Sequence, residues 1–353
     1  MSSRACGIRE ARTEIRLESK REFTEYEENN TVKSLPFLIH ALSPTHAGVG
    51  QEVDVIDLPI ARLKATGIPF LPGSGIKGVL RDARENQEQD ERRRLTKEHC
   101  YAIFGPPTDK AAEHAGALTV GDARLLALPV RSFRGTFAWV TSPLLLTMAQ
   151  RDCDTVLPLP TRLPTPTPGA RNQRGREVPA RWALVETVTG ADSNLNVWNA
   201  GKDPYILLED LDLPVFESPE TGGWARALAP YVAPPDRPDY FTRRWVVVDD
   251  ETMTFLWETA TQVDTRVRLN PETRTVDPGA LWTEESLPPE TLLLGLLVAD
   301  RSRRKDMDRP LSPEDVLDMA LPRTEILQFG GKATVGRGRC RLIPLRPASH
   351  PEQ

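Results

Sequence analysis

Apolar positions begin only after residue 33, and they then recur in short runs separated by turn-rich or charged stretches. Residues 1–33 are polar, and we interpret them as an extension ahead of the folded domain. The apolar run Ser34–Leu42 is typical of a buried strand. Ser43–Gln51 is rich in turn residues, and Glu52–Phe70 follows no clean period, so an ordered loop is expected there.

Helical spacing follows a turn rich in glycine and serine. In Leu71–Asn86, four apolar positions share one helical face: Ile76, Val79, Leu80 and Ala83. Arg84–Lys97 is almost wholly charged or amide, which indicates a solvated helix or loop. A second short helix is expected at Ser312–Leu321, with Ser312 as N-cap and Asp315 in the capping-box position.

Most other apolar runs predict strands of a core. They are Leu118–Val130, Gly135–Leu146, Glu290–Asp300, which also fits a helix, and Arg339–Leu345. The proline-rich segment Val156–Pro179 predicts a long loop or insertion, and residues 180–250 carry no pattern that assigns them. Strands and helices mix without a strict βαβ alternation, so an α+β fold is favoured over a doubly wound sheet.

A basic β-hairpin is predicted at Gln262–Val276. One set of alternate positions holds Val263, Thr265, Val267 and Leu269, and the other holds Asp264, Arg266, Arg268 and Asn270. This period of two is that of a strand, and the sequence NPET that follows is a good turn. The hairpin should therefore present one basic face.

Composition bounds the class of protein. The chain has 353 residues, of which 39% are hydrophobic and 27% charged, enough for one large domain with insertions or for two ordinary ones. Its net charge of −5 counts against a generally basic nucleic-acid binder, but 45 basic side chains allow a local basic groove. With no apolar targeting segment at the start and no run long enough to span a bilayer, we expect a soluble, cytoplasmic protein.

The four cysteines and five histidines are dispersed. No CxxC pair is present, so a structural zinc site is not expected and the cysteines are interpreted as isolated reduced thiols. A GxSxG elbow and an HExxH helix are also absent from the sequence, which removes two common hydrolase classes.

Gly73–Gly78 matches the pattern GxGxxG. A dinucleotide site would need a long strand before the motif and an acidic residue on a second strand about 20 residues later. The preceding apolar run ends at Pro72, and the later region is a charged run, so this hypothesis is disfavoured. A helix start that binds phosphate, with Lys77 and Arg81 one turn apart, remains open beside an ordinary turn and cap.

Phe329–Arg339 is a second glycine-rich basic loop. It lacks the glycine spacing of a Walker A motif, and Ala333 follows Lys332 where that motif has Ser or Thr. Its glycines allow close backbone approach, and Lys332, Arg337 and Arg339 supply charge. Two such loops in one chain favour a ligand with many phosphates over a single nucleotide.

Acidic side chains with one histidine gather around residues 46–57. His46, Glu52, Asp54 and Asp57 could bind a divalent ion or transfer protons. Solvated loop carboxylates explain the same pattern, so the residue types alone leave both interpretations open.

Five segments in order resemble the family of backbone subunits of the Cmr complex, a type III-B CRISPR effector, in the RAMP (repeat-associated mysterious protein) superfamily. They are Thr45–Gly50 (THAGVG), Val55–Arg81 with DLPIARLKATGIPFLPGS as its most specific part, Glu113–Leu146, Ala280–Leu293 and Phe329–Arg339. The resemblance spans about 300 residues. The extension at the N-terminus and the insertion at 156–179 depart from the family's plain pattern.

This resemblance implies a ferredoxin-like, RRM-like palm over residues 34–347, with a thumb hairpin at about 260–283 and a tail at 348–353. Subunits of the family stack along a guide RNA together with other Cmr-complex subunits, and they cut single-stranded target RNA at regular intervals. The resemblance implies no membrane partner. The implied catalytic residue is Asp57, which could act as a base or bind Mg²⁺ or Mn²⁺, with His46 and Glu284 as auxiliary acid or base candidates. The implied RNA-binding residues are Arg62, Ser74, Lys77, Arg81, Arg266, Arg268, Gly331, Lys332, Arg337 and Arg339.

Two alternatives share the fold. In the first, the chain is a non-catalytic RNA-binding scaffold of the same complex, and Asp57 is structural. In the second, it is a ribonuclease that processes the guide precursor. The DLPI motif, the hairpin and the lack of a histidine-centred site argue against the second.

Overall fold

The computed structural model describes residues 32–48, 56–85, 95–153, 159–165, 181–185, 195, 205–304, 307 and 309–346. Most of the predicted extension, most of the proline-rich insertion and the tail lie outside these residues. The chain divides into two compact units. One contains Leu80–Thr119 and Leu297–Pro322, and the other contains Leu35–Val79, Val120–Leu296 and Arg323–Gln353.

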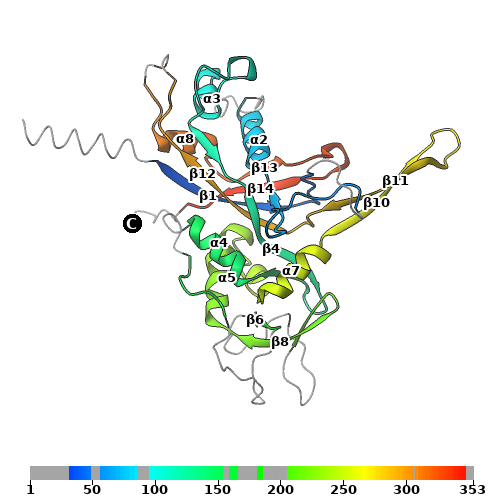
Figure 1. Cartoon of the computed structure of the whole chain (residues 1–353). Coiled ribbons are helices and arrows are strands. Elements are labelled where there is room, and N and C mark those ends of the chain that lie inside the picture. The colour runs from blue at the N-terminus through cyan, green and yellow to red at the C-terminus, as the bar shows by residue number, and fades with distance from the viewer. Residues whose placement is uncertain are drawn as a thin grey trace, which may run out of the picture. The chain divides into compact units, whose positions relative to one another are not determined.

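Twelve strands of the described residues form one sheet, in the order β13-β14-β1-β12-β4-β5-β9-β6-β8-β7, with β2 beside β4 and β3 beside β12 (Figure 1). Their bounds are β1 (Lys33–Ala41), β2 (Phe70–Leu71), β3 (Leu118–Val120), β4 (Ala123–Ser132), β5 (Thr136–Thr141), β6 (Ala183–Val185), β7 (Tyr205–Leu208), β8 (Leu211–Glu217), β9 (Trp245–Val248), β12 (Leu292–Ala299), β13 (Glu325–Gln328) and β14 (Arg339–Pro344). The strands predicted at Ser34–Leu42, Leu118–Val130 and Arg339–Leu345 are confirmed.

The sheet is mixed, and part of it closes on itself. β5 runs parallel to β9 and β6 parallel to β8, whereas β1 with β14, β4 with β5 and β12 with β4 are antiparallel. Ser132 of β4 also pairs with Leu208 of β7, so the strands from β4 to β7 form a barrel-like ring. This arrangement confirms the α+β class and differs from the parallel sheet of a dinucleotide-binding domain.

Helices occur where the 3.6-residue pattern predicts them and in three further regions of the described residues, 97–104, 143–153 and 219–259. Their bounds are α2 (Gly73–Glu85), α3 (Lys97–Phe104), α4 (Pro143–Cys153), α5 (Pro219–Val232), α6 (Asp239–Thr242), α7 (Asp250–Thr259) and α8 (Pro313–Ala320), with short 3₁₀ turns η1 (Thr108–Lys110) and η2 (Ala333–Val335). In α8, Ser312 and Asp315 form the predicted capping box. Among the described residues, the second unit contributes six elements between residues 205 and 259, most of which lie in the stretch 180–250 that the sequence pattern left unassigned.

The strand predicted at Gly135–Leu146 is wrong in its second half. β5 ends at Thr141, and α4 begins at Pro143. Proline is well tolerated at the first helical position because its missing N–H would have no partner there. The apolar run Leu144–Leu146 therefore belongs to a helix, which buries Leu145, Leu146 and Ala149.

The main core lies in the second unit. Side chains from β4, β9 and β12 meet the buried faces of α4 and α5 there. Trp139 of β5 is fully buried, and its ring centroid lies 4.7 Å from that of Phe137 and 4.9 Å from that of Phe241. Its Nε1 donates a hydrogen bond of 2.8 Å to the backbone oxygen of Glu290. Trp139 thus joins aromatic packing to the segment before β12.

The first unit has its own packing. Arg84, near the end of α2, is buried, and its Nε donates to the backbone oxygens of Met319 and Ala320. These carbonyls are in the last turn of α8, where a helix leaves its own carbonyls without partners. Arg84 therefore caps α8.

We expect Trp139→Ala to lower the free energy of unfolding by about 3–5 kcal/mol, because it removes a buried indole and leaves a cavity. Urea denaturation followed by tryptophan fluorescence or circular dichroism measures this. Phe133→Ala is the matched control, because Phe133 is 76% exposed. That variant should stay within about 0.5 kcal/mol of the wild type. Equal losses in the two variants would contradict the assignment of Trp139 to the core.

Candidate functional site

The hairpin predicted at Gln262–Val276 is present and longer than the sequence pattern indicated. It consists of β10 (Gln262–Leu269) and β11 (Val276–Ser286), which pair antiparallel from Gln262 opposite Ser286. At the turn, the Asn270 side chain accepts hydrogen bonds from the backbone of Glu272 and Thr273. Figure 1 shows this hairpin projecting from the rest of its unit.

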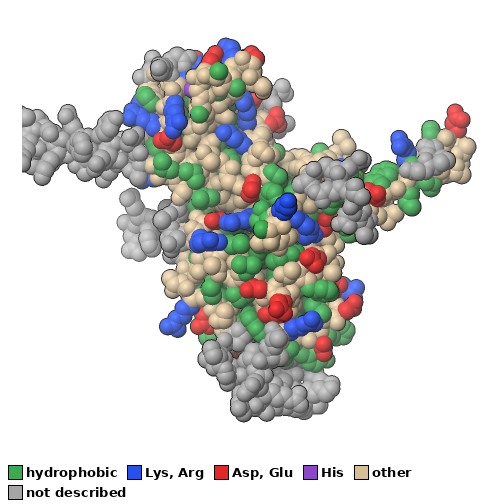
Figure 2. Space-filling model, in the orientation of Figure 1, with side chains coloured by type: hydrophobic (Ala, Val, Ile, Leu, Met, Phe, Trp, Pro, Cys, Tyr) green, Lys and Arg blue, Asp and Glu red, His purple; other side chains and the backbone are tan. Residues whose placement is uncertain are grey.

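Strand alternation gives the hairpin two different faces. Arg266 lies opposite Trp282, and Asp264 opposite Glu284, on one face. The other face carries exposed apolar side chains, among them Val263, Val267, Leu269 and Leu281. Figure 2 shows hydrophobic side chains along the hairpin and charged ones near its tip.

Asp57 lies at the base of the hairpin and is exposed to solvent. Its Oδ2 accepts hydrogen bonds from the backbone N–H and the hydroxyl of Thr283, at 2.7 and 2.9 Å. The Asp57 N–H in turn donates to the Thr283 hydroxyl at 3.1 Å. The backbone and then the side-chain hydrogen bonds from Thr283 hold the pKa of Asp57 below its ordinary value, so the carboxylate is ionised at neutral pH.

Glu285 fixes the segment that carries Asp57. Its buried carboxylate accepts from the Ile60 N–H at 3.0 Å, from Arg62 at 2.5 Å and from the Thr261 hydroxyl at 2.7 Å. Leu58 bridges to β11 through backbone hydrogen bonds with Thr283 and Glu285. The stretch from Asp57 to Arg62 is therefore ordered without regular secondary structure, as the sequence predicted for this loop.

Glu284 points to the opposite face and is also buried. Its carboxylate forms an ion pair with Lys332, accepts from Trp282 Nε1 at 2.7 Å and lies 3.4 Å from Arg266 Nε. Burial is the largest single effect on its pKa and raises it. The hydrogen bonds from Lys332 and Trp282 and the charges of Lys332 and Arg266 together outweigh burial, and the pKa of Glu284 is lowered.

Arg337 joins the glycine-rich loop to the hairpin. Its guanidinium is only 5% exposed and pairs with Asp264 at 2.5 Å. It also donates to the Ser286 hydroxyl and lies 4.0 Å from Glu284 Oε2. The hydrogen bond from Arg337 lowers the pKa of Asp264 against the opposing effect of burial. Arg337 therefore stabilises the packing of the glycine-rich loop against the hairpin. Its contact with RNA stays a prediction.

The glycine-rich loop approaches its neighbours more closely than a side chain would allow. A Cβ on Gly330 would lie 2.1 Å from the His46 backbone oxygen, and one on Gly338 would lie 1.9 Å from the Phe329 oxygen. Both glycines have positive φ, 73° and 77°. The Gly331 N–H donates to the His46 oxygen at 3.1 Å, so the loop is held against the segment before Asp57.

His46 is buried between these elements. Its Nδ1 lies 2.7 Å from the Glu285 backbone oxygen, and since a carbonyl only accepts, Nδ1 carries the proton. In the neutral ring, Nε2 is then the acceptor. Gly48 lies beside Nε2, where a Cβ would come within 2.7 Å.

The predicted residues fall into two groups. Asp57, Arg62, His46, Glu284, Lys332, Arg337 and Arg266 meet at the base of the hairpin. Ser74, Lys77 and Arg81 lie together on α2, where Arg81 pairs with Glu85. Arg268, Gly331 and Arg339 are exposed. All of these roles in RNA binding and cleavage stay predictions.

Three contributors were missed: Thr283, Glu285 and Asp264. Thr283 and Glu285 lie in the sequence TEES. In a strand, this sequence places Thr283 and Glu285 on one face and Glu284 on the other. That alternation was the available signal. Nothing local in the sequence indicates that Thr283 meets Asp57, because 226 positions separate them.

Metal ligands are sparse in the described part of the chain. No group of three or more His, Cys, Asp or Glu side chains able to hold an ion occurs among the described residues. Glu52 and Asp54, which the sequence placed near Asp57, lie outside those residues. Asp57 therefore offers one carboxylate, and its role as a metal ligand stays a prediction.

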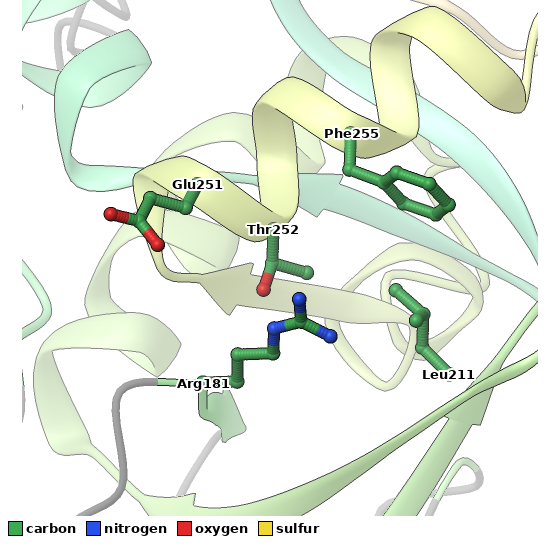
Figure 3. Close-up of a pocket in the computed structure, with 5 residues that line it drawn as sticks. All are labelled: Arg181, Leu211, Glu251, Thr252 and Phe255. Atoms are coloured by element: carbon green, nitrogen blue, oxygen red, sulfur yellow. The ribbon is translucent and has the colours of Figure 1, made fainter.

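A small cavity of about 100 Å³ opens elsewhere in the second unit (Figure 3). It is lined by Arg181, Leu211, Glu251, Thr252 and Phe255. None of the predicted site residues lines it.

Among the described helices, none combines the length and apolarity that crossing a membrane requires.

The fold and the site define an α+β protein in which a projecting hairpin and a basic glycine-rich loop meet beside one exposed, ionised carboxylate. The sequence profile of the RAMP superfamily matches residues 38–341. A curated relative from Pyrococcus furiosus, named CRISPR system Cmr endoribonuclease Cmr4, is 35% identical over 302 residues, which cover 85% of this chain and 92% of the relative. The chain belongs to the RAMP superfamily and, within it, to the Cmr4 family.

Solved structures agree in fold. The crystal structure of oligomeric Cmr4 from Pyrococcus furiosus matches with a TM-score of 0.61 and 24% identity, over 90% of this chain and all of that one. A chain in the cryo-electron microscopy structure of type III-B Cmr-beta bound to cognate target RNA matches with a TM-score of 0.63 and 18% identity, over 90% and 98% of the two chains.

A glycine series tests the close approach in the loop. Gly338→Ala adds both a left-handed backbone penalty and a backbone clash, and should cost roughly 3 kcal/mol or more of unfolding free energy. Gly336 has a φ of 80° and open space around it, so Gly336→Ala should cost only about 1–2 kcal/mol. Gly331→Ala is the control and should be nearly neutral. Chemical denaturation ranks the three, and a neutral Gly338→Ala would contradict the loop geometry.

Glu284 should make stability depend on pH. Its folded pKa lies below the ordinary 4.5, so its contribution is fully present above that value and is lost as pH falls through the folded pKa. Glu284→Gln should cost about 3 kcal/mol at pH 7, because Lys332 and Arg337 lose a buried partner. Measured by urea titration, the difference in unfolding free energy between Glu284→Gln and the wild type should narrow below pH 4.5. Glu272→Gln changes a glutamate at the exposed turn and should have the same unfolding free energy as the wild type. A constant gap would argue against this pairing.

Proposed function

We propose that this chain is an RNA-binding backbone subunit of a type III-B CRISPR ribonucleoprotein. In this role it cleaves target RNA at regular intervals, with Asp57 as the catalytic residue. The observation that carries the proposal is an exposed, ionised carboxylate held by Thr283 at the base of a projecting hairpin. The 35% identical relative, which is named a Cmr endoribonuclease, supports it. So does the fold shared with a Cmr complex bound to target RNA.

The sheet supports a ferredoxin-like palm as part of this proposal. β14, β1, β12 and β4 are neighbours in that order. Along the chain, α2 follows β1 and α8 follows β12. Two βαβ units whose strands interleave in this way make a split βαβ fold. The hairpin of β10 and β11 then takes the place of a thumb inserted between β4 and β12.

In the proposed role, RNA is held through its backbone, since guide pairing supplies sequence recognition. Arg268 and Arg339 are exposed, and they form no ion pair with described residues, so their charges are available to phosphates. Ser74 and Lys77 near the start of α2 form a second contact region. Arg62 and Arg337 instead hold the site together, because Arg62 already pairs with the buried Glu285 and Arg337 with the half-buried Asp264.

The partners in this proposal are a guide RNA, a single-stranded target RNA, further copies of the chain and other Cmr subunits in the cytoplasm. The oligomeric crystal structure of Cmr4 from Pyrococcus furiosus supports self-association. The exposed apolar face of the hairpin can separate target bases from the guide, and so present the strand to Asp57.

Cleavage in this scheme is attack by the RNA's own 2′-hydroxyl on the adjacent phosphorus, which forms a 2′,3′-cyclic phosphate and breaks the bond from phosphorus to the 5′-oxygen of the next nucleotide. The 2′-hydroxyl gives up its proton, and the departing 5′-oxygen takes one from water. Holding the hydroxyl in line with the scissile bond lowers the activation barrier by several kcal/mol. Orientation of reacting groups can contribute roughly 7–11 kcal/mol in all. A carboxylate with a lowered pKa is a weak base at neutral pH. Asp57 is therefore better suited to orienting the hydroxyl or a cation, and His46 and Glu284 stay auxiliary candidates for proton transfer.

Mg²⁺ or Mn²⁺ remains part of the proposal in a restricted form. The described residues supply Asp57 but no set of ligands for a resident ion. Mg²⁺ commonly binds through one or two carboxylates together with substrate phosphates and water. An ion shared in this way between Asp57 and RNA would neutralise charge at the scissile phosphate.

Asp57→Asn in the guide-loaded complex should lower the rate of target cleavage at least about 100-fold while target binding stays unchanged. Single-turnover cleavage of labelled RNA with Mg²⁺ or with EDTA, and binding measured in parallel, test this. Asp212→Asn changes an exposed aspartate on β8 and is the matched control. Cleavage by Asp57→Asn at the wild-type rate would favour the scaffold alternative, in which Asp57 is structural.

A further inference from the structure

We propose that Thr283 is the positioning residue for cleavage, because its hydroxyl fixes the orientation of the Asp57 carboxylate beside the RNA. The proposal rests on the proposed function of Asp57. It adds a residue on β11, far away in sequence, without which the carboxylate would be present but misdirected.

The hydrogen bonds define the geometry. The Thr283 hydroxyl accepts from the Asp57 N–H at 3.1 Å and donates to Asp57 Oδ2 at 2.9 Å. Since a hydroxyl has a single proton, accepting from the amide leaves that proton for the carboxylate. A second donor, the Thr283 N–H, reaches the same Oδ2 at 2.7 Å. One oxygen of the carboxylate is thus held from two directions.

This restraint matters because Asp57 is on the surface. An exposed carboxylate can rotate about its side-chain bonds, and catalytic groups lose rate steeply when they leave their productive geometry. Among the described residues, Thr283 is the one other residue that hydrogen-bonds the Asp57 side chain. The orientation of Asp57 therefore depends on β11, the strand that forms one half of the hairpin.

The protein should fold without the Thr283 hydroxyl. Leu58 remains bonded to β11 through its own N–H and oxygen, to Thr283 and Glu285 respectively. Glu285 independently holds Ile60 and Arg62. Thr283→Val keeps the shape and branching of the side chain and the backbone donor, and removes only the hydroxyl.

The experiment compares three variants in the guide-loaded complex. Thr283→Val should slow single-turnover cleavage about 10- to 100-fold, with target affinity unchanged, since one hydrogen bond to a charged group is lost. Thr283→Ser restores the hydroxyl and should recover the rate to within about threefold, although it removes the methyl group. Thr324→Val is the control and should cleave at the wild-type rate, because Thr324 is an exposed threonine just before β13 and lies outside the hairpin and the Asp57 site.

Wild-type cleavage by Thr283→Val, while Asp57→Asn is inactive, would overturn the positioning role and leave the proposed function standing. Slow cleavage by both Val and Ser variants would also overturn it, because the defect would then follow the altered packing and not the hydroxyl. Cleavage by Asp57→Asn itself marks failure of the proposed function, and the two failures are thereby separated.

Discussion

The site depends on two consecutive buried glutamates on β11. Glu284 and Glu285 point to opposite faces of the hairpin, because neighbouring side chains on a strand alternate. A buried carboxylate is costly unless charged or hydrogen-bonding groups surround it. Glu285 obtains its partners from the segment that follows Asp57, and Glu284 obtains them from the glycine-rich loop and β10. One strand thereby organises two loops that lie about 270 residues apart in the sequence.

This requirement explains why both loops are ordered without much regular structure. Ion pairs buried in this way contribute little net stability, since desolvation offsets their attraction, but breaking one leaves an uncompensated charge. Their effect is therefore to specify one arrangement. If either loop were displaced, Glu284 or Glu285 would be left buried without a partner. The glycines at 330 and 338 are the steric counterpart, because only they permit the close approach that brings Lys332 and Arg337 to the hairpin.

Local pattern was enough for much of the fold and for the neighbourhood of the site. β1, α2, the capping box of α8 and the hairpin all follow from periodicity and turn chemistry over a few residues. Residues 205–259 did not, because their strands and helices are short and mixed, so no single period persists. α4 was misread as strand because three consecutive leucines fit both periods, and only Pro143 marked the helix start.

The charges of the site could not be read in the same way. A basic residue in the sequence looks identical whether it faces solvent or a buried acid, and the pairs Arg62 with Glu285 and Arg337 with Asp264 join distant positions. These pairings also bear on the net charge of −5. With some cations committed to structure, not all of the 45 basic side chains are available to RNA, and each phosphate contact adds only about one released counterion. Under the proposed function, subunits linked along one RNA add their weak contacts at high effective concentration. Copies arranged along the RNA would thereby compensate for the negative net charge of each chain.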